Sequence, residues 1–142
     1  MSERNTHDDV RIPDEDRAAV TELPRRVMAA WADHDAETFS EIFAETGTMI
    51  LPGVHLKGRE AIKTFLTEAF AGPYKGTRVT GTPIDVRFFT PVSGLFITRG
   101  GVLAPGEEEP SRERAVHACW VVVKEGGEWR LASYQNSPRH TA

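Results

Sequence analysis

His117 is the side chain in this sequence best suited to acid/base chemistry, because histidine titrates close to neutral pH. It stands in the middle of the apolar segment Ala115–Trp120, which has the composition of a β-strand. Alternation along a strand groups His117 with Cys119 and Val121 on one face. Both faces are partly apolar, so the pattern leaves open which of them is interior. A histidine that is hydrogen-bonded across the sheet, or that faces a dimer partner, is the alternative interpretation.

Two neighbouring amides, Gln135 and Asn136, end the last strand-like segment. An amide offers both a donor and an acceptor, which suits it to hold a carbonyl or enolate oxygen. Successive strand residues point to opposite faces, so only one of the two can face a ligand. We predict that His117 and Asn136 form a catalytic pair, with Gln135 as the other candidate amide. Capping of the strand end is the alternative role for both amides.

Several further side chains are candidates for ligand contact. Loops at the rim of a cavity often hold functional groups, an inward-pointing arginine can bind a carboxylate or phosphate, and tryptophan can stack on a flat or polyunsaturated ligand. A surface or packing role is the alternative for each of them. Besides Gln135, the predicted ligand-binding residues are Trp31, His55 (in the loop 52–57), Tyr74, Arg78, Arg99 and Trp120.

The composition disfavours several classes of function. The formal net charge is −4, from 17 basic and 21 acidic residues, and no basic stripe is present to bind nucleic acid. The two internal histidines, His55 and His117, have no carboxylate pair at ligand spacing, so we expect no metal site. The sequence has no glycine-rich phosphate loop after a strand, no serine-centred elbow and no nicotinamide or flavin signature, so we also expect no cofactor.

The apolar segments are too short to cross a membrane, and the polar residues 1–13 lack the apolar region of a signal peptide. We therefore expect a cytoplasmic protein that does not contact membranes. Its single cysteine, Cys119, has apolar neighbours and no activating charge nearby, which indicates a buried and inert thiol.

The elements that must position these side chains change character along the chain. Apolar residues at helical spacing predict helices from Asp14 (as N-cap) to about Trp31, after Asp35, and from Gly58 to Gly72. Strand-like segments follow in the second half, and Pro83 within one of them predicts a bulge or an edge position. The predicted strands are 47–51, 77–89, 94–103, 114–124 and 128–136, with one further short strand before the third helix.

This order predicts an α+β fold in which a curved, mostly antiparallel sheet wraps around three helices from the N-terminal half. A sheet curled around helices encloses a cavity where a small molecule can bind. We expect one domain over residues 14–137, with a flexible tail at residues 1–13 and a short tail at 138–142.

The sequence resembles the SnoaL-like group of the nuclear transport factor 2-like superfamily, and within it the SgcJ/EcaC-type proteins. The resemblance covers about residues 14–137. The segment Lys57–Ile62 (KGREAI) is typical of the superfamily, and the ending Gln135-Asn136 of the narrower branch. Further matching segments are 23–24, 30–31, 34–37, 53–56, 74–78, 103–106 and 128–134.

The resemblance implies the cone fold and dimers that form through the outer face of the sheet. The narrower branch occurs with enediyne polyketide biosynthesis, whereas the superfamily as a whole includes cyclases, isomerases, dehydratases, hydrolases and non-catalytic binding modules. SnoaL-type cyclases use an Asp or His in the pocket as acid/base. The last two strands of this chain supply no Asp in that role and instead carry His117, Gln135 and Asn136.

We therefore predict a small-molecule binding protein or enzyme of secondary metabolism, of the enediyne or polyketide antibiotic type. Its candidate reaction is acid/base cyclisation or isomerisation of a polyketide-like intermediate in an apolar cavity. One alternative is a non-catalytic carrier or self-resistance protein that sequesters its ligand. Another is an assembly module that recruits a partner enzyme. The predicted partners are a small apolar or polyunsaturated ligand and a second copy of the chain.

Overall fold

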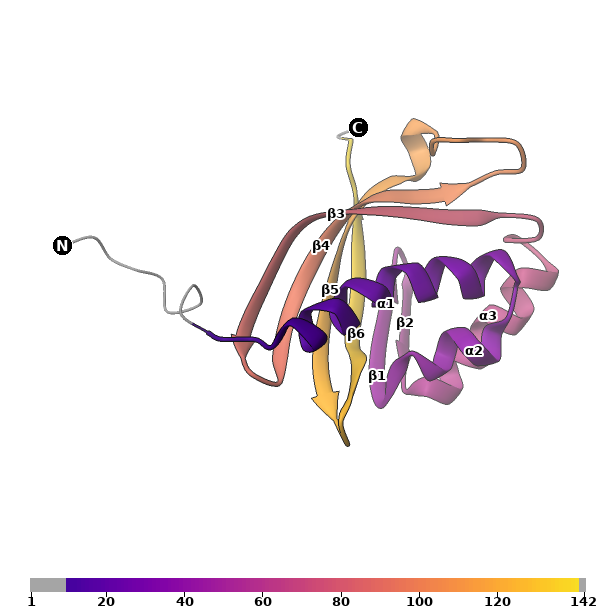
Figure 1. Cartoon of the computed structure of the whole chain (residues 1–142). Helices are drawn as coiled ribbons and strands as arrows, with labels where there is room; N and C mark the ends of the chain where they lie inside the picture. The colour runs from indigo at the N-terminus through magenta and orange to yellow at the C-terminus, as the bar shows by residue number, and fades with distance from the viewer. Residues whose placement is uncertain (1–9, 141–142) are drawn as a thin grey trace.

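A curved sheet with helices on one side forms the described part of the chain, residues 10–140, in the computed structural model (Figure 1). The helices are α1 (Asp14–Ala32), α2 (Ala36–Glu41) and α3 (Arg59–Ala71), and a short 3₁₀ helix, η2, spans Arg112–Arg114. The strands are β1 (Phe43–Leu51), β2 (Val54–Lys57), β3 (Arg78–Thr90), β4 (Ser93–Leu103), β5 (Ala115–Glu125) and β6 (Glu128–Pro138).

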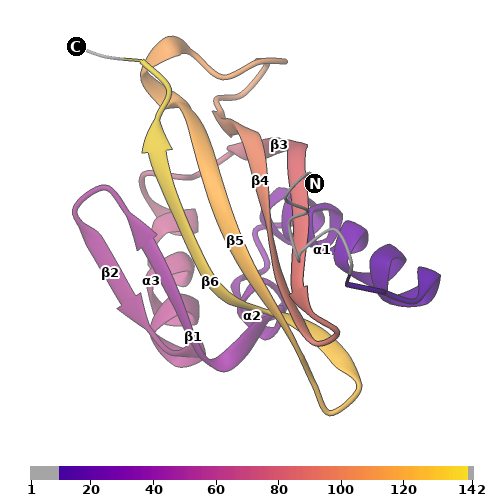
Figure 2. The same cartoon turned by 90° about the vertical axis from the view of Figure 1, so that its left-hand side faces the viewer.

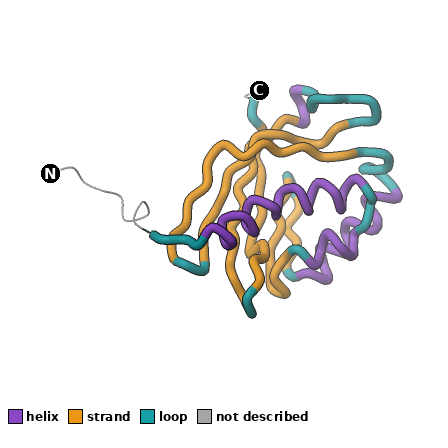
Figure 3. The backbone as a smooth tube through the Cα atoms, viewed as in Figure 1, coloured by secondary structure: helices purple, strands orange, loops and turns teal. Residues whose placement is uncertain are grey.

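The six strands form a single sheet in the order β2-β1-β6-β5-β4-β3. All neighbouring strands are antiparallel except β1 and β6, which are parallel. The helices lie against one face of the sheet, here called the inner face, and leave the opposite, outer face uncovered (Figures 2 and 3). The predicted α+β fold, with a curved and mostly antiparallel sheet around three helices, is confirmed.

Helix α1 buries one stripe of its surface, as its apolar spacing predicts, with Val20, Leu23, Val27 and Trp31 all in the core. The helix begins one residue earlier than expected, because Pro13 occupies the N-cap position and Asp14 is already helical. The acidic residues of this first turn still match the positive end of the helix dipole.

The N-terminal end of α1 is attached to the β5–β6 hairpin through Asp16, which is buried. The Asp16 carboxylate accepts hydrogen bonds from Trp129 Nε1 and Lys124 Nζ, each at 3.0 Å. These two contacts hold the pKa of Asp16 below its ordinary value. They fix the position of α1 across the inner face of the sheet, where it forms one wall of the cavity described below.

Two other local predictions agree with the structure. Asp35 caps α2, where its Oδ1 accepts a hydrogen bond from the Thr38 backbone N–H at 3.0 Å. Pro83 lies in β3, which is an edge strand, and the register with β4 shifts between Pro83 and Asp85. A proline is tolerated there because an edge strand can lack one ladder donor.

The ends of the domain differ in detail from the prediction. Residues 1–9 of the predicted N-terminal tail lie outside the described residues, while Val10 and Ile12 pack against the core. At the other end β6 extends to Pro138, beyond the predicted strand end at residue 136, and the Arg139 backbone N–H bonds Ala115 O. In β1 the strand starts at Phe43 rather than at Gly47.

Candidate ligand-binding cavity

A cavity of about 480 Å³ lies between α1 and the inner face of the sheet. This volume is within the range of sites that bind small organic molecules. Strands β3 to β6 and helix α1 supply most of its wall, and the loop after α3 supplies part of its rim. Typical apolar lining residues are Val27, Met28, Phe39, Met49, Val116 and Ala118.

Two tryptophans form much of the aromatic wall, and both have their N–H groups bonded within the protein. Trp31 Nε1 donates to Thr77 Oγ1 at 3.0 Å, and Trp120 Nε1 donates to Thr98 Oγ1 at 2.9 Å. Trp31 contacts the Tyr74 ring at 4.9 Å between centroids. Because both indole N–H groups already have acceptors, these side chains offer a ligand mainly their apolar ring surfaces.

Strand β6 contributes two polar side chains to the wall, Tyr134 and Asn136. Asn136 Nδ2 donates to Tyr134 Oη at 3.0 Å. The other amide atom, Asn136 Oδ1, is buried and has no hydrogen-bond partner among the described residues. The pair therefore presents one unused acceptor and one phenolic hydrogen beside the cavity.

Both tyrosines that line the cavity are held in the protonated state. Burial is the main cause that raises the pKa of Tyr134. The hydrogen bond from Asn136 lowers this pKa, and the nearby Tyr74 raises it. Burial also raises the pKa of Tyr74. At neutral pH both phenols are hydrogen-bond donors rather than bases, so the interior carries no charge from them.

The charged lining residues are Lys75, Glu113 and Arg114, which come from the segments that frame the cavity after α3 and before β5. The pKa of Glu113 is lowered mainly because its carboxylate accepts a hydrogen bond from the backbone N–H of the same residue. A carboxylate with a lowered pKa is a weak general base at neutral pH. The wall of the cavity thus offers hydrogen bonds without a strong base.

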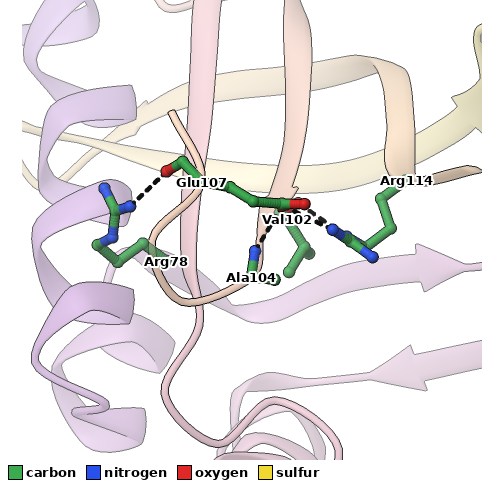
Figure 4. Close-up of polar contacts among 5 residues, drawn as sticks. All are labelled: Arg78, Val102, Ala104, Glu107 and Arg114. Atoms are coloured by element: carbon green, nitrogen blue, oxygen red, sulfur yellow. Dashed lines mark hydrogen bonds and ion pairs between the residues drawn. The ribbon is translucent and has the colours of Figure 1, made fainter. Parts of the chain in front are cut away.

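The loop between β4 and β5 closes one side of the rim, where Ala104 and Pro105 line the cavity, and Glu107 holds this loop in place (Figure 4). Its Oε1 accepts hydrogen bonds from the Ala104 backbone N–H at 2.8 Å and from Arg114 Nη2 at 2.6 Å. Its backbone carbonyl accepts from Arg78 Nη2 at 2.7 Å. The same arginine, Arg114, also donates from Nε to Val102 O at 3.2 Å.

We expect the substitution Glu107→Gln to loosen this rim. Arg114 and the Ala104 amide lower the pKa of Glu107, so the stabilisation is present above the ordinary glutamate pKa and is lost as the pH falls through the lowered value. Glutamine keeps an oxygen for Ala104 but loses the charge that attracts Arg114. Hydrogen exchange measured by mass spectrometry over residues 103–111 should be severalfold faster in the variant at neutral pH. The exposed neighbour Glu108 provides the control Glu108→Gln, and equal protection in both variants would contradict this role.

The structure brings four of the predicted site residues to the cavity and leaves five outside it. Trp31, Tyr74, Trp120 and Asn136 line it. Arg78 is exposed and bonds the rim loop. His55 is exposed on β2, so its expected place in a loop is wrong. The remaining three, His117, Arg99 and Gln135, are exposed on the outer face.

The register explains why His117 and Asn136 do not meet. Asn136 pairs with Ala118, and His117 pairs with Ser137 and Arg99. Residues adjacent in a strand point to opposite faces, so His117 is outside the cavity that Asn136 lines. The structure therefore does not assemble the predicted acid/base pair. It instead places Tyr134, which the sequence analysis did not single out, beside Asn136; their separation by two residues in one strand is the signal that could have found it.

Within residues 10–140, no group of three or more His, Cys, Asp or Glu side chains is placed to hold a metal ion. Cys119 is half-buried on the outer face, where burial raises the pKa of its thiol. No helix among those described is long and apolar enough to span a membrane.

Comparison with solved structures finds the same fold in several bacterial proteins. A domain of unknown function with a cystatin-like fold from Nostoc punctiforme is 32% identical, with a TM-score of 0.84 over 91% of this chain and 80% of that one. A second protein of that organism is 17% identical, with a TM-score of 0.78 over 92% and 97% of the two chains.

An NTF2-like protein from Novosphingobium aromaticivorans is 22% identical, with a TM-score of 0.76 over 90% of this chain and 84% of that one. None of the curated proteins matches this chain significantly. The model of the SnoaL-like domain matches residues 14–135, which run from the start of α1 into the second half of β6. The chain therefore belongs to the family of SnoaL-like domains, and it shares the cystatin-like fold of the Nostoc domain and of the NTF2-like protein.

Proposed function

We propose that this protein binds a small, flat and largely apolar molecule of polyketide-like chemistry in the cavity between α1 and the sheet. The observation that carries the proposal is a cavity of about 480 Å³ whose aromatic wall includes one hydrogen-bonding pair, Tyr134 and Asn136. Sites of this kind, mostly apolar with a few polar groups, are typical of small-molecule binding. The resemblance to proteins of polyketide biosynthesis supports this ligand class.

Binding is favoured over proton abstraction by the groups that line the cavity. Glu113 is the carboxylate among the described lining residues, and its lowered pKa makes it a weak base. A carrier or sequestration role requires only the cavity and its hydrogen bonds, so it is the function that these residues support best.

A second candidate is an isomerase or cyclase that acts on a carbonyl compound. The protonated Tyr134 favours it, because a phenol in an apolar cavity can donate a hydrogen bond to a developing enolate oxygen. The Asn136 amide, which donates to Tyr134 Oη, would help to orient that phenol. In this case Tyr134→Phe should reduce turnover more than it reduces binding.

Native mass spectrometry of the protein purified from its own host tests the proposal. We expect a retained molecule of small mass at one copy per chain, which can then be released, identified and incubated with the protein. An unchanged molecule supports a carrier, and conversion supports the isomerase or cyclase. Failure to retain or rebind any small molecule would contradict both.

The outer face of the sheet is a candidate surface for a homodimer. It carries Leu95, Ile97, Val121 and Val123, which are half-buried with no helix over them in residues 10–140. We expect Val121→Glu to weaken dimerisation about tenfold or more, because it places a charge in an apolar interface. Light scattering after size-exclusion chromatography measures the mass. The control is Thr64→Glu, because Thr64 is exposed on α3, away from the outer face of the sheet. If the unmodified protein is a monomer, the expectation is wrong.

A further inference from the structure

We infer that the ligand is uncharged and carries a hydroxyl group, an alcohol or a phenol, that donates its hydrogen to Asn136 Oδ1. This inference rests on the proposed function and specifies which chemical group that site recognises. Its starting point is the amide oxygen itself, which is buried beside the cavity without a partner. Protein atoms enclose this oxygen, so a ligand reaches it only with a small movement of the neighbouring side chains. A buried acceptor that stays unpaired is unfavourable, so a ligand that supplies a donor to it gains affinity.

The surrounding hydrogen bonds leave this oxygen no internal donor. The amide nitrogen of Asn136 is engaged with Tyr134 Oη at 3.0 Å, which leaves the amide oxygen as the atom without a partner. The indole of Trp120, which packs against the Tyr134 ring, donates its N–H to Thr98 Oγ1 at 2.9 Å. The second indole of the cavity, Trp31, donates to Thr77. No group in residues 10–140 donates to Asn136 Oδ1, so we assign its donor to the occupant of the cavity.

The same ligand group can use both members of the pair. Tyr134 Oη accepts from Asn136, so its own hydrogen is available to the ligand. A hydroxyl oxygen can accept that hydrogen while its own hydrogen points to Asn136 Oδ1. An ether or a ketone can accept from Tyr134 but supplies no hydrogen for Asn136, so it satisfies only half of the pair.

The charges around the cavity argue against an anionic ligand. The Glu107 carboxylate lies 2.6 Å from Arg114 Nη2, so the positive charge of this arginine is already balanced within the protein. The Lys75 side chain is exposed, so its charge is well solvated. A carboxylate or phenolate beside Asn136 Oδ1 would place a negative charge against an acceptor oxygen, which is unfavourable in an apolar cavity.

A matched series of naphthalenes tests the inference by isothermal titration calorimetry on the full chain. The probes are 2-naphthol, 2-methoxynaphthalene and 2-acetylnaphthalene, which share one ring system and differ in the group they offer to Asn136. We expect the unmodified protein to bind 2-naphthol about tenfold more tightly than either other probe, a ratio typical of one buried hydrogen bond. In Asn136→Leu the three affinities should become equal. Gln135→Leu, on the outer face, should retain the preference.

Each outcome separates this inference from the proposal on which it rests. Equal binding of 2-naphthol and 2-methoxynaphthalene by the unmodified protein would overturn the inference and leave the binding function intact. Preference for 2-acetylnaphthalene would also overturn it, because the amide would then present its NH₂ to the ligand. Binding of none of the three would contradict the proposed function itself. The comparison within the unmodified protein decides the question even where Asn136→Leu fails to fold.

Discussion

Replacing Ala118 with phenylalanine should abolish binding of small ligands while the fold remains intact. Ala118 is buried in β5 between Thr98 of β4 and Asn136 of β6, and all three residues line the cavity. A phenyl ring at this position would project into the empty volume of about 480 Å³ and occupy the space that a flat ligand needs. Overpacking in a filled core costs about 1–3 kcal/mol, and the available space keeps the cost of this change small.

The expected result for Ala118→Phe is an affinity for 2-naphthol at least about 100-fold below that of the unmodified protein, measured by isothermal titration calorimetry. Circular dichroism and thermal unfolding should show a folded protein. The preceding residue provides the matched control, since His117 points to the outer face. His117→Phe and His117→Ala should both leave binding unchanged. Loss of binding in the His117 variants, with Ala118→Phe unaffected, would place the site on the opposite face of the sheet.

The sequence was sufficient to predict the fold because its local signals are strong and agree with one another. Asp35 caps α2 through the Thr38 N–H, and Gly58 occupies the N-cap of α3 at a φ of 92°, a conformation that few other residues adopt. Pro83 indicated a bulge at an edge strand, where it lies. Each of these signals depends on a few consecutive residues, so they could be interpreted without knowledge of the tertiary structure.

The face of the sheet that lines the cavity could not be predicted, because both faces of β5 are partly apolar and β6 contains an irregularity. Val122 pairs with Leu131, but the preceding residue, Val121, pairs with Ser133. This shift leaves Ala132 as an additional residue in β6. Strict alternation from the buried Leu131 would have placed Gln135 inside. The bulge instead brings Tyr134 and Asn136 to the inner face, and only tertiary pairing determines its position.

Leu131, at the start of this bulge, should be among the most sensitive positions for stability. Its side chain is fully buried, and its backbone lies between β1 and β5, paired with Phe43 and Val122. Its backbone N–H also donates to Ile42 O at 2.9 Å, which links β6 to the end of α2. Truncation removes apolar contacts and leaves a cavity at the point where the helices meet the sheet.

We expect Leu131→Ala to reduce the free energy of unfolding by about 2–5 kcal/mol in urea denaturation monitored by tryptophan fluorescence. The control is Ile84→Ala, whose side chain is 47% exposed in the edge strand and whose loss should change stability by less than about 0.5 kcal/mol. Equal effects of the two substitutions would contradict the position of the core. Because Leu131 precedes the bulge that turns Tyr134 and Asn136 inward, its truncation should also weaken 2-naphthol binding under conditions where the variant is still folded. A destabilised variant with unchanged affinity would show instead that the bulge holds the pair in place without Leu131.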